Sequence, residues 1–364
     1  MLRDLEQDNK MEETMKLKNL LAIGISLFAF SAVSADDCNR CDPCPSLCDA
    51  CDPCDGWSAH VDWLFWKVRR SGLDYAVDGD TNTSTIFSGY PYGKIRCLEP
   101  TRDSGVRVGV FKACDDFDFG VRYTYFSADD SAGITGFNIF GTRGHPIEAV
   151  ISFDDLDLAA SKYDVELNQF DIEAGYLFRT DCDGLVRPFA GARFASIDQS
   201  INTVYDELTG STLATGQATL INEKLDMDAF GLYAGLEGTM DGWCNIGLFG
   251  RFSAGLALGE FNAEHSEYDV SAAHEGHVTG ERVLHAKSDC YQIVPNWEFT
   301  VGLTYDLCDF CCVDWNLAIG YEFHEWCCLP DFINFDDDEQ IGHLARNGSS
   351  LGFDGLFVRL GASF

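Results

Sequence analysis

The sequence predicts an all-β fold: a transmembrane antiparallel up-and-down β-barrel of about 10–12 strands, with short periplasmic turns and long extracellular loops. Three observations predict it. Apolar and polar residues alternate with the period of a strand through most of the chain from residue 57 onward. Several alternating segments far exceed the about five or six residues usual for strands of soluble proteins. Short and long connections alternate along the chain.

The clearest strand is the segment 291–307. Ile293, Phe299 and Leu303 are among the apolar residues on one of its faces, whereas Glu298 and Thr300 lie on the other. A tilted strand crosses a bilayer in about 9–11 residues. We therefore expect this segment to cross the membrane and to extend into a loop.

The remaining strands repeat this alternation. They are expected at 59–67, 105–111, 117–126, 170–178, 186–197, 225–240, 245–261, 313–323 and 352–364. The short connections are 112–116, 179–184, 241–244 and 308–312, and the long polar ones are 69–103, 127–162, 198–224, 262–290 and 324–350. This pattern gives ten strands with both ends in the periplasm, and an additional hairpin at 136–140 and 149–153 would give twelve.

Charged residues distinguish a membrane barrel from a soluble β-sandwich, which remains the alternative fold. In a barrel, the face that touches lipid should carry no charge along the middle of each strand. The charged residues of the strands fall on the face opposite the apolar one and would therefore line the lumen. The predicted pore-lining residues are Arg107, Arg122, Asp171, Glu173, Arg187, Arg193, Arg251, Glu298, Asp314, Glu322 and Arg359.

The N-terminus has the features of an export signal. Lys16 and Lys18 precede the apolar segment 20–30, which is too short to span a bilayer, and Val33-Ser34-Ala35 supplies small residues for cleavage after Ala35. An uncleaved anchor helix is the alternative. Since residues 1–14 are acidic, Met15 is the expected start. The predicted domains are 1–35 (upstream extension and signal peptide), 36–56 (Cys-rich periplasmic segment) and 57–364 (barrel).

The cysteines sort by side of the membrane in this topology. Sixteen cysteines indicate disulfides in an oxidising compartment. Twelve precede the first strand or lie at short turns, where they are candidates for cross-links on the periplasmic side: Cys38, Cys41, Cys44, Cys48, Cys51, Cys54, Cys114, Cys182, Cys244, Cys308, Cys311 and Cys312. The remaining four, Cys97, Cys290, Cys327 and Cys328, belong to the long loops.

Metal and cofactor chemistry receives little support. The spacing of Cys38, Cys41, Cys44 and Cys48 matches an iron–sulfur cluster run, but Asp49 follows where that run has proline. Zinc held by two C-x2-C pairs, and calcium on the acidic run 336–339, are further alternatives. No C-x-x-C-H sequence indicates covalent haem. We therefore predict no metal and no cofactor.

The composition of the chain excludes other classes of protein. With 59 acidic and 25 basic residues and a net charge of −34, a nucleic-acid partner is not expected. The chain has no apolar run of the roughly 18 residues that a membrane-spanning helix needs. Because much of the acid excess lies in loops, a pore would have a weak preference for cations.

The start of the barrel resembles the Legionella-type pore-forming major outer-membrane protein family. The residues that carry the resemblance are Trp57, Leu64, Trp66-Lys67, Gly72-Leu73-Asp74-Tyr75-Ala76, Gly105-Val106-Arg107-Val108-Gly109 and Tyr123-Thr124-Tyr125. The similarity runs from about Trp57 to Phe364 and implies an outer-membrane porin in a group often cross-linked by disulfides. The Cys-rich N-terminal segment departs from this pattern and is more similar to the Cys-rich envelope proteins of chlamydia-like bacteria. Phe364 resembles the C-terminal signal for barrel assembly.

The predicted function is therefore passive diffusion of small hydrophilic solutes through an outer-membrane pore. The same inward charges would equally satisfy a filled barrel, so the alternative is a structural or adhesive barrel without an open pore. An enzyme is not predicted, because most of the eight histidines lie in loops without a recognisable catalytic arrangement. The expected partners are outer-membrane lipid, the barrel-assembly machinery, and further copies of the chain or disulfide-linked envelope proteins.

Overall fold

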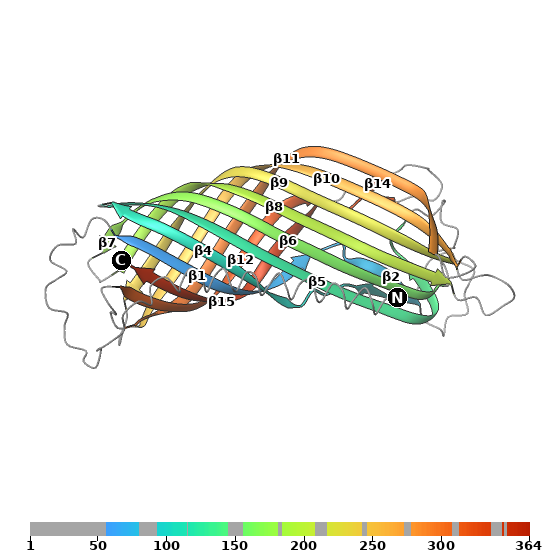
Figure 1. The fold of residues 1–364 in the computed structure, drawn as a ribbon, viewed down its shortest axis with the longest axis horizontal. Coiled ribbons are helices and arrows are strands. Elements are labelled where there is room, and N and C mark those ends of the chain that lie inside the picture. Colours follow the sequence, from blue (N-terminus) through green and yellow to red (C-terminus); the bar gives the residue numbers. More distant parts are fainter. Residues whose placement is uncertain are drawn as a thin grey trace. The chain divides into compact units, whose positions relative to one another are not determined.

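A computed structural model describes residues 56–79, 93–114, 116–144, 156–180, 184–207, 217–241, 246–272, 278–307, 313–335, 344–345 and 348–364. All of them belong to the second of two units, Asp52–Phe364. The predicted signal peptide and Cys-rich segment lie outside the described residues. Every regular element in the described part is a β-strand (Figure 1).

Ten strands close into an antiparallel ring. The order is β5-β4-β1-β15-β12-β11-β10-β9-β8-β6, and pairing of β6 with β5 closes it. The ring strands are β1 (Trp57–Arg70), β4 (Arg102–Cys114), β5 (Phe117–Gly141), β6 (Leu156–Tyr176), β8 (Gly184–Glu207), β9 (Gln217–Asp241), β10 (Ile246–Ala272), β11 (Val278–Asp306), β12 (Asp314–Pro330) and β15 (Gly348–Ser363). The smaller strands are β2 (Asp74–Gly79), β3 (Gly93–Cys97), β7 (Phe178–Thr180), β13 (Asn334–Phe335) and β14 (Leu344–Ala345).

The N-terminal strand β1 and the C-terminal strand β15 pair along the whole length of β1. Ser58 lies opposite Ser363, and Arg70 lies opposite Leu351. The backbone N–H of Trp57 donates to the carbonyl of Phe364 at 2.7 Å, and the N–H of Phe364 donates back at 2.8 Å. The C-terminal strand therefore completes the barrel and leaves no free edge at this end.

The described strands end beside all four predicted short turns, but the predicted long loops differ from the structure. Six strands run far into segments that were expected to be loops: β5, β6, β8, β9, β10 and β11 have 25, 21, 24, 25, 27 and 29 residues. Residues 136–140 continue β5 and form no separate hairpin, while 149–153 lie outside the described residues. The barrel therefore has ten strands and a wall that extends beyond the membrane.

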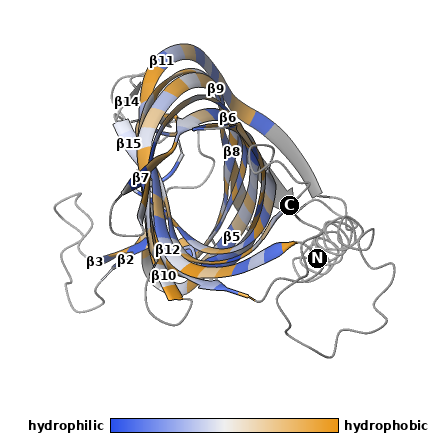
Figure 2. Cartoon of the chain, turned by 90° about the vertical axis from the view of Figure 1, so that its left-hand side faces the viewer, coloured by the Kyte–Doolittle hydropathy of each residue, from blue (hydrophilic) through white to orange (hydrophobic). Residues whose placement is uncertain are grey.

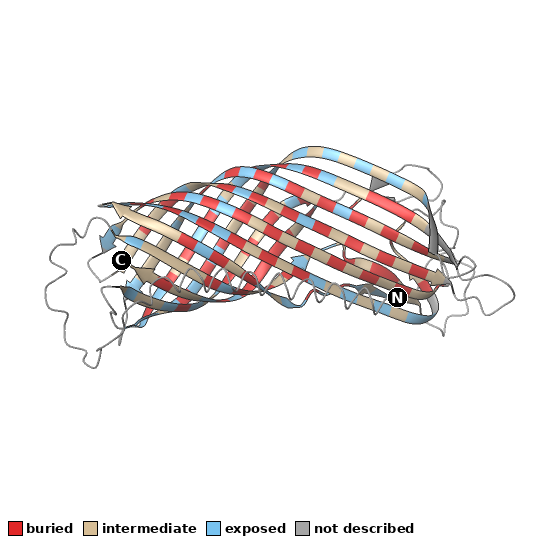
Figure 3. Ribbon diagram, viewed as in Figure 1, coloured by how far each residue is buried: buried red, intermediate tan, exposed pale blue. Residues whose placement is uncertain are grey.

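The two ends of each long strand have opposite chemistry. On β6, Phe170 and Ile172 face outward and are exposed, while Asp171 faces inward and is buried. Further along the same strand Tyr163 faces inward with 0% exposure, and Asp164 faces outward. Hydropathy and burial alternate along the strands in Figures 2 and 3. Apolar residues thus face lipid in one half and an enclosed core in the other, where water replaces lipid outside.

Within the described ranges, no helix is long and apolar enough to cross a bilayer.

Candidate functional site: a charged network inside the barrel

The interior of the membrane-spanning half contains a network of paired charges. Six arginines and seven carboxylates take part, and they form three clusters centred on Asp62, Asp171 and Glu173. One net negative charge remains, since seven carboxylates face six guanidinium groups.

Strand register assembles the Asp62 cluster. Asp62 on β1 lies opposite Arg107 of β4 and Arg359 of β15. Arg359 Nε donates to Asp62 Oδ1 at 2.7 Å, and Arg107 Nη1 donates to Asp62 Oδ2 at 3.2 Å. Arg107 also binds Glu322 of β12 at 2.9 Å, and Trp66 Nε1 donates to the same carboxylate at 2.8 Å. Asp62 is 0% exposed and fully enclosed by these partners.

The Asp171 cluster crosses the lumen. Arg193 and Arg122 each donate to Asp171 at 2.8 Å, and both also reach Glu298, at 2.7 and 3.4 Å. Arg122 belongs to β5 and Glu298 to β11, which are five strands apart in either direction around the ring. Their ion pair therefore joins opposite walls of the barrel.

The Glu173 cluster lies between β5, β6, β8, β9 and β10. Arg251 Nη2 donates to Glu173 Oε2 at 2.6 Å, and Arg187 Nη1 donates to Oε1 at 2.8 Å. Arg251 also binds Glu237 at 2.8 Å, and Arg187 binds Asp118. Each arginine in this cluster thus has at least two carboxylate partners.

Burial makes these pairings obligatory. Charges removed from water carry a desolvation cost of several kcal/mol each, which is offset only when partners and hydrogen bonds are in place. Side-chain exposure in the Asp171 cluster is only 1% for both Arg193 and Asp171. A rearrangement of the network must therefore leave every buried charge with at least one partner.

The structure places ten of the eleven predicted pore-lining residues in this network. The exception is Asp314, which is exposed at the first position of β12. Sequence reasoning missed Asp62, Asp118 and Glu237. All three lie at inward positions of their strands, so the alternation that identified the others was a signal for them as well.

An aromatic layer covers the network toward the extracellular side. Trp66, Phe126 and Phe353 are 0% exposed, and their ring centroids lie 5.3 to 5.7 Å apart. Beyond this layer, Phe332 of the segment after β12 is buried, with the guanidinium carbons of Arg70 and Arg143 at 4.7 and 5.9 Å from its ring centroid. Side chains thus close the described lumen at two levels.

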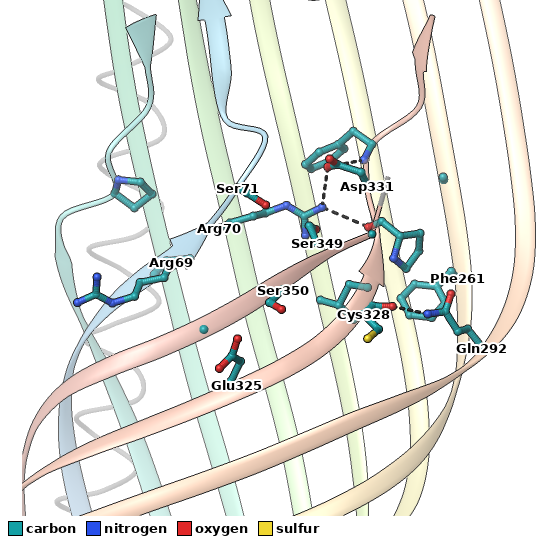
Figure 4. Close-up of a pocket in the computed structure, with 18 of the residues that line it drawn as sticks. Arg69, Arg70, Ser71, Phe261, Gln292, Glu325, Cys328, Asp331, Ser349 and Ser350 are labelled. Atoms are coloured by element: carbon teal, nitrogen blue, oxygen red, sulfur yellow. Dashed lines mark hydrogen bonds and ion pairs between the residues drawn. The ribbon is translucent and has the colours of Figure 1, made fainter. Parts of the chain in front are cut away.

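Two cavities flank the closed region. A cavity of about 300 Å³ lies on the periplasmic side, where Ser58, His60 and Ala113 line it together with arginines of the network. A cavity of about 1020 Å³ lies on the extracellular side, between β1, β10, β11, β12 and β15. Figure 4 shows Arg70 at this cavity. Its guanidinium donates to Asp331 at 3.3 Å and to Gln199, which does not line the cavity, at 2.6 Å.

A buried histidine in the extracellular half was not anticipated from the sequence. His265 of β10 is 1% exposed, with Nε2 at 2.8 Å from Glu267 and Nδ1 at 3.5 Å from Glu223. Glu223 also pairs with Arg143. Burial by itself lowers the pKa of His265, but the hydrogen bonds and charges of Glu223 and Glu267 outweigh it and raise the pKa to about 9. His265 is therefore a cation at neutral pH.

The described cysteines are thiols. Cys97, Cys114, Cys290, Cys327 and Cys328 form no disulfide. Of the twelve predicted cross-link cysteines only Cys114 is among the described residues, and the other eleven lie outside them. Within the ranges that the structure describes, no group of three His, Cys, Asp or Glu side chains is arranged to hold a metal ion.

A closed antiparallel ring, an apolar outer belt and a polar interior define an outer-membrane β-barrel protein. The chain belongs to the Legionella major outer membrane protein family: the family model described as "Legionella pneumophila major outer membrane protein precursor" matches residues 51–364. This match confirms the resemblance found in the sequence.

Solved structures with a similar arrangement are outer-membrane barrels. The outer membrane protease OmpT from Escherichia coli is 10% identical, with a TM-score of 0.41, and the match covers 86% of this chain and 97% of that one. A Pseudomonas aeruginosa FadL homologue is 9% identical (TM-score 0.26; 86% and 90% covered), and the P. putida toluene transporter TodX is 8% identical (TM-score 0.26; 85% and 90% covered). Comparison with curated protein sequences found no match.

Proposed function

We propose that this barrel is a gated pore for the passive diffusion of small hydrophilic solutes across the outer membrane. The observation that carries the proposal is the network of charged side chains that lines the lumen between the periplasmic cavity and the aromatic layer. Polar and charged linings favour water and hydrophilic solutes over apolar ones. The excess carboxylate of the network and the net charge of −34 give the pore a weak preference for cations.

Central carboxylates of the network each have two arginine partners, which supports gating. Glu298 is held by Arg193 and Arg122, and Glu173 is held by Arg251 and Arg187. One arginine can therefore swing away while the carboxylate keeps the other. Such an exchange opens space without leaving a buried charge unpaired, which would cost about 3–5 kcal/mol.

The second candidate is a structural or adhesive barrel without an open pore. The aromatic layer favours it, because Trp66, Phe126 and Phe353 have no exposure and would have to move for a solute to pass. The two candidates differ in one measurable property, which is ion conductance.

Planar-bilayer recording of the purified full-length protein tests the proposal. We expect brief openings of low conductance, with a reversal potential in a salt gradient that indicates a cation preference. Denatured protein is the control. Absence of any conductance at all voltages would contradict the pore and leave the structural barrel.

An enzymatic function is not proposed. A histidine acts as a general base only when it is unprotonated near the operating pH, whereas a histidine with a pKa of about 9 carries its proton at neutral pH. Since His265 is also 1% exposed, a substrate has no access to it in this arrangement.

Export with cleavage after Ala35 and disulfide cross-linking through the predicted cysteines are further parts of the proposal. Mass spectrometry of the mature N-terminus tests the cleavage. Gel mobility with and without reductant tests intermolecular cross-links, and identical mobility would contradict them.

A further inference from the structure

The outer wall changes from apolar to charged side chains at one level. On β1, the outward-facing Trp63 and Phe65 are followed by Lys67 and Arg69. On β4, read in the same direction, Val108 and Val106 give way to Arg102. This level is the extracellular boundary of the apolar belt, where lipid headgroups lie.

The sign of the charge at this boundary differs around the ring. On the wall formed by β6, β8, β9 and β10 the outward-facing residues at and above the boundary are mainly acidic: Glu166, Asp198, Asp226, Asp228 and Glu260. Burial and the neighbouring carboxylates Asp226, Glu166 and Asp228 raise the pKa of Asp198. The wall formed by β1 and β4 instead presents three cations, Lys67, Arg69 and Arg102, which we call the basic cluster.

The basic cluster is not neutralised by the barrel itself. Lys67 and Arg102 are direct cross-strand partners, and like charges in this position repel each other. Asp354 lies opposite Lys67 on β15, but its carboxylate accepts from Arg69 Nη2 at 3.2 Å and from the Tyr321 hydroxyl, and its side chain is 3% exposed.

The basic cluster and its partner Asp354 therefore have a positive net charge. Within the described residues, no ion pair of 4.0 Å or less joins Lys67 or Arg102 to a carboxylate. Three cations against Asp354 leave two positive charges. Glu325 on β12 and Asp129 on β5 are further acidic residues on the outer face, and neither forms an ion pair with the basic cluster. An anion beside Lys67 and Arg102 would relieve their repulsion.

We infer that the basic cluster binds the phosphate of an anionic lipid in the outer leaflet. Lysine and arginine donate charge-assisted hydrogen bonds to phosphate oxygens. Directly below the cluster, Trp63 is 55%, Leu356 49% and Tyr321 40% exposed, which provides an apolar surface for acyl chains. The combination of cations and an adjoining apolar surface selects a phospholipid or phosphorylated glycolipid rather than a free anion.

Binding of lipid A to the full-length protein in nanodiscs of zwitterionic lipid tests this inference. Native mass spectrometry would count bound lipid for diphosphorylated lipid A and for its dephosphorylated counterpart. We expect the phosphorylated lipid to bind about 10-fold or more tightly, and the preference to disappear in the K67Q/R102Q variant. The K112Q/R179Q variant, which loses two cations at the periplasmic end of the barrel, should keep the preference.

Three results would overturn the inference. They are equal binding of the two lipids by the unmodified protein, loss of the preference in K112Q/R179Q, and displacement of the lipid by inorganic phosphate at equal concentration. The comparison of the two lipids needs no variant, so a folding defect in K67Q/R102Q leaves the test decisive. Since the measurement involves no conductance, its outcome is independent of the proposed pore.

Discussion

Asp62 is the residue on which the interior of this barrel depends most. It is 0% exposed and is the shared partner of Arg359 and Arg107, which come from the strands on either side of it. A single buried carboxylate therefore pairs with the buried guanidinium of Arg107 and the partly buried one of Arg359. Residues of this kind fix the register of neighbouring strands as well as the charge balance of the lumen.

Replacement of Asp62 by alanine should lower the free energy of unfolding by about 3–5 kcal/mol, because two buried arginines lose a partner. Urea unfolding in lipid vesicles, followed by tryptophan fluorescence, measures the effect. Asp314→Ala on the exposed rim is the matched control and should change stability by less than about 1 kcal/mol. Equal effects of the two substitutions would contradict the role of Asp62.

His265 makes stability depend on pH. Its pKa of about 9 in the folded state exceeds the ordinary value of about 6.5, so the folded protein binds this proton more tightly. The protonated His265 adds about 3 kcal/mol to the free energy of unfolding. This stabilisation is fully present below about pH 6.5 and is lost as the pH rises through about 9. The free energy of unfolding should fall over this range in the unmodified protein and less in His265→Gln. Parallel pH profiles would contradict this assignment.

At the scale of the element, a single long strand crosses the lipid-facing belt and the water-exposed region beyond it. Its alternation of inward and outward residues continues through both. In the belt of β6 the outward residues are Phe170 and Ile172, and beyond it they are Glu166 and Asp164. The side chains on the inward face change in the opposite sense, from Asp171 to Tyr163. The point of exchange marks the membrane boundary on each long strand.

Lysine substitutions on β6 test this boundary. Ile172→Lys places a charge in the lipid-facing belt and should cost about 2–4 kcal/mol. Asp164→Lys, on the same outward face beyond the belt, loses only the exposed pair with Lys162 and should cost no more than about 1 kcal/mol. Vesicle unfolding compares the two, and a larger effect of Asp164→Lys would contradict the placement of the belt.

At the scale of the whole molecule, alternation predicted the closed barrel and the direction of the inward charges. It did not predict the length of the wall. The predicted loop 127–162 includes Lys162, and Asp164 and Glu166 lay outside the predicted strands, although all three only face water. Nor could it predict which charges meet. Arg107 and Glu322 are 215 residues apart, and the curvature of the closed ring decides their contact.

The aromatic layer was missed for a related reason. Trp66 and Phe353 occupy the same inward face as the charged residues nearer the periplasm, so one face of a strand carries two kinds of side chain. Such a layer is identified by inward positions that change from charged to apolar residues while the alternation continues. This change is present in the sequence of each long strand.

The central claim is that paired charges across the lumen, together with the aromatic layer above them, keep the pore closed. Single-channel conductance of the R122Q/E298Q variant tests it most directly, because this change removes the pair that joins opposite walls and keeps the net charge and the Arg193–Asp171 pair. We predict more frequent and larger openings than in the unmodified protein, with the barrel still folded. A folded R122Q/E298Q barrel that conducts no better than the unmodified protein would contradict the account.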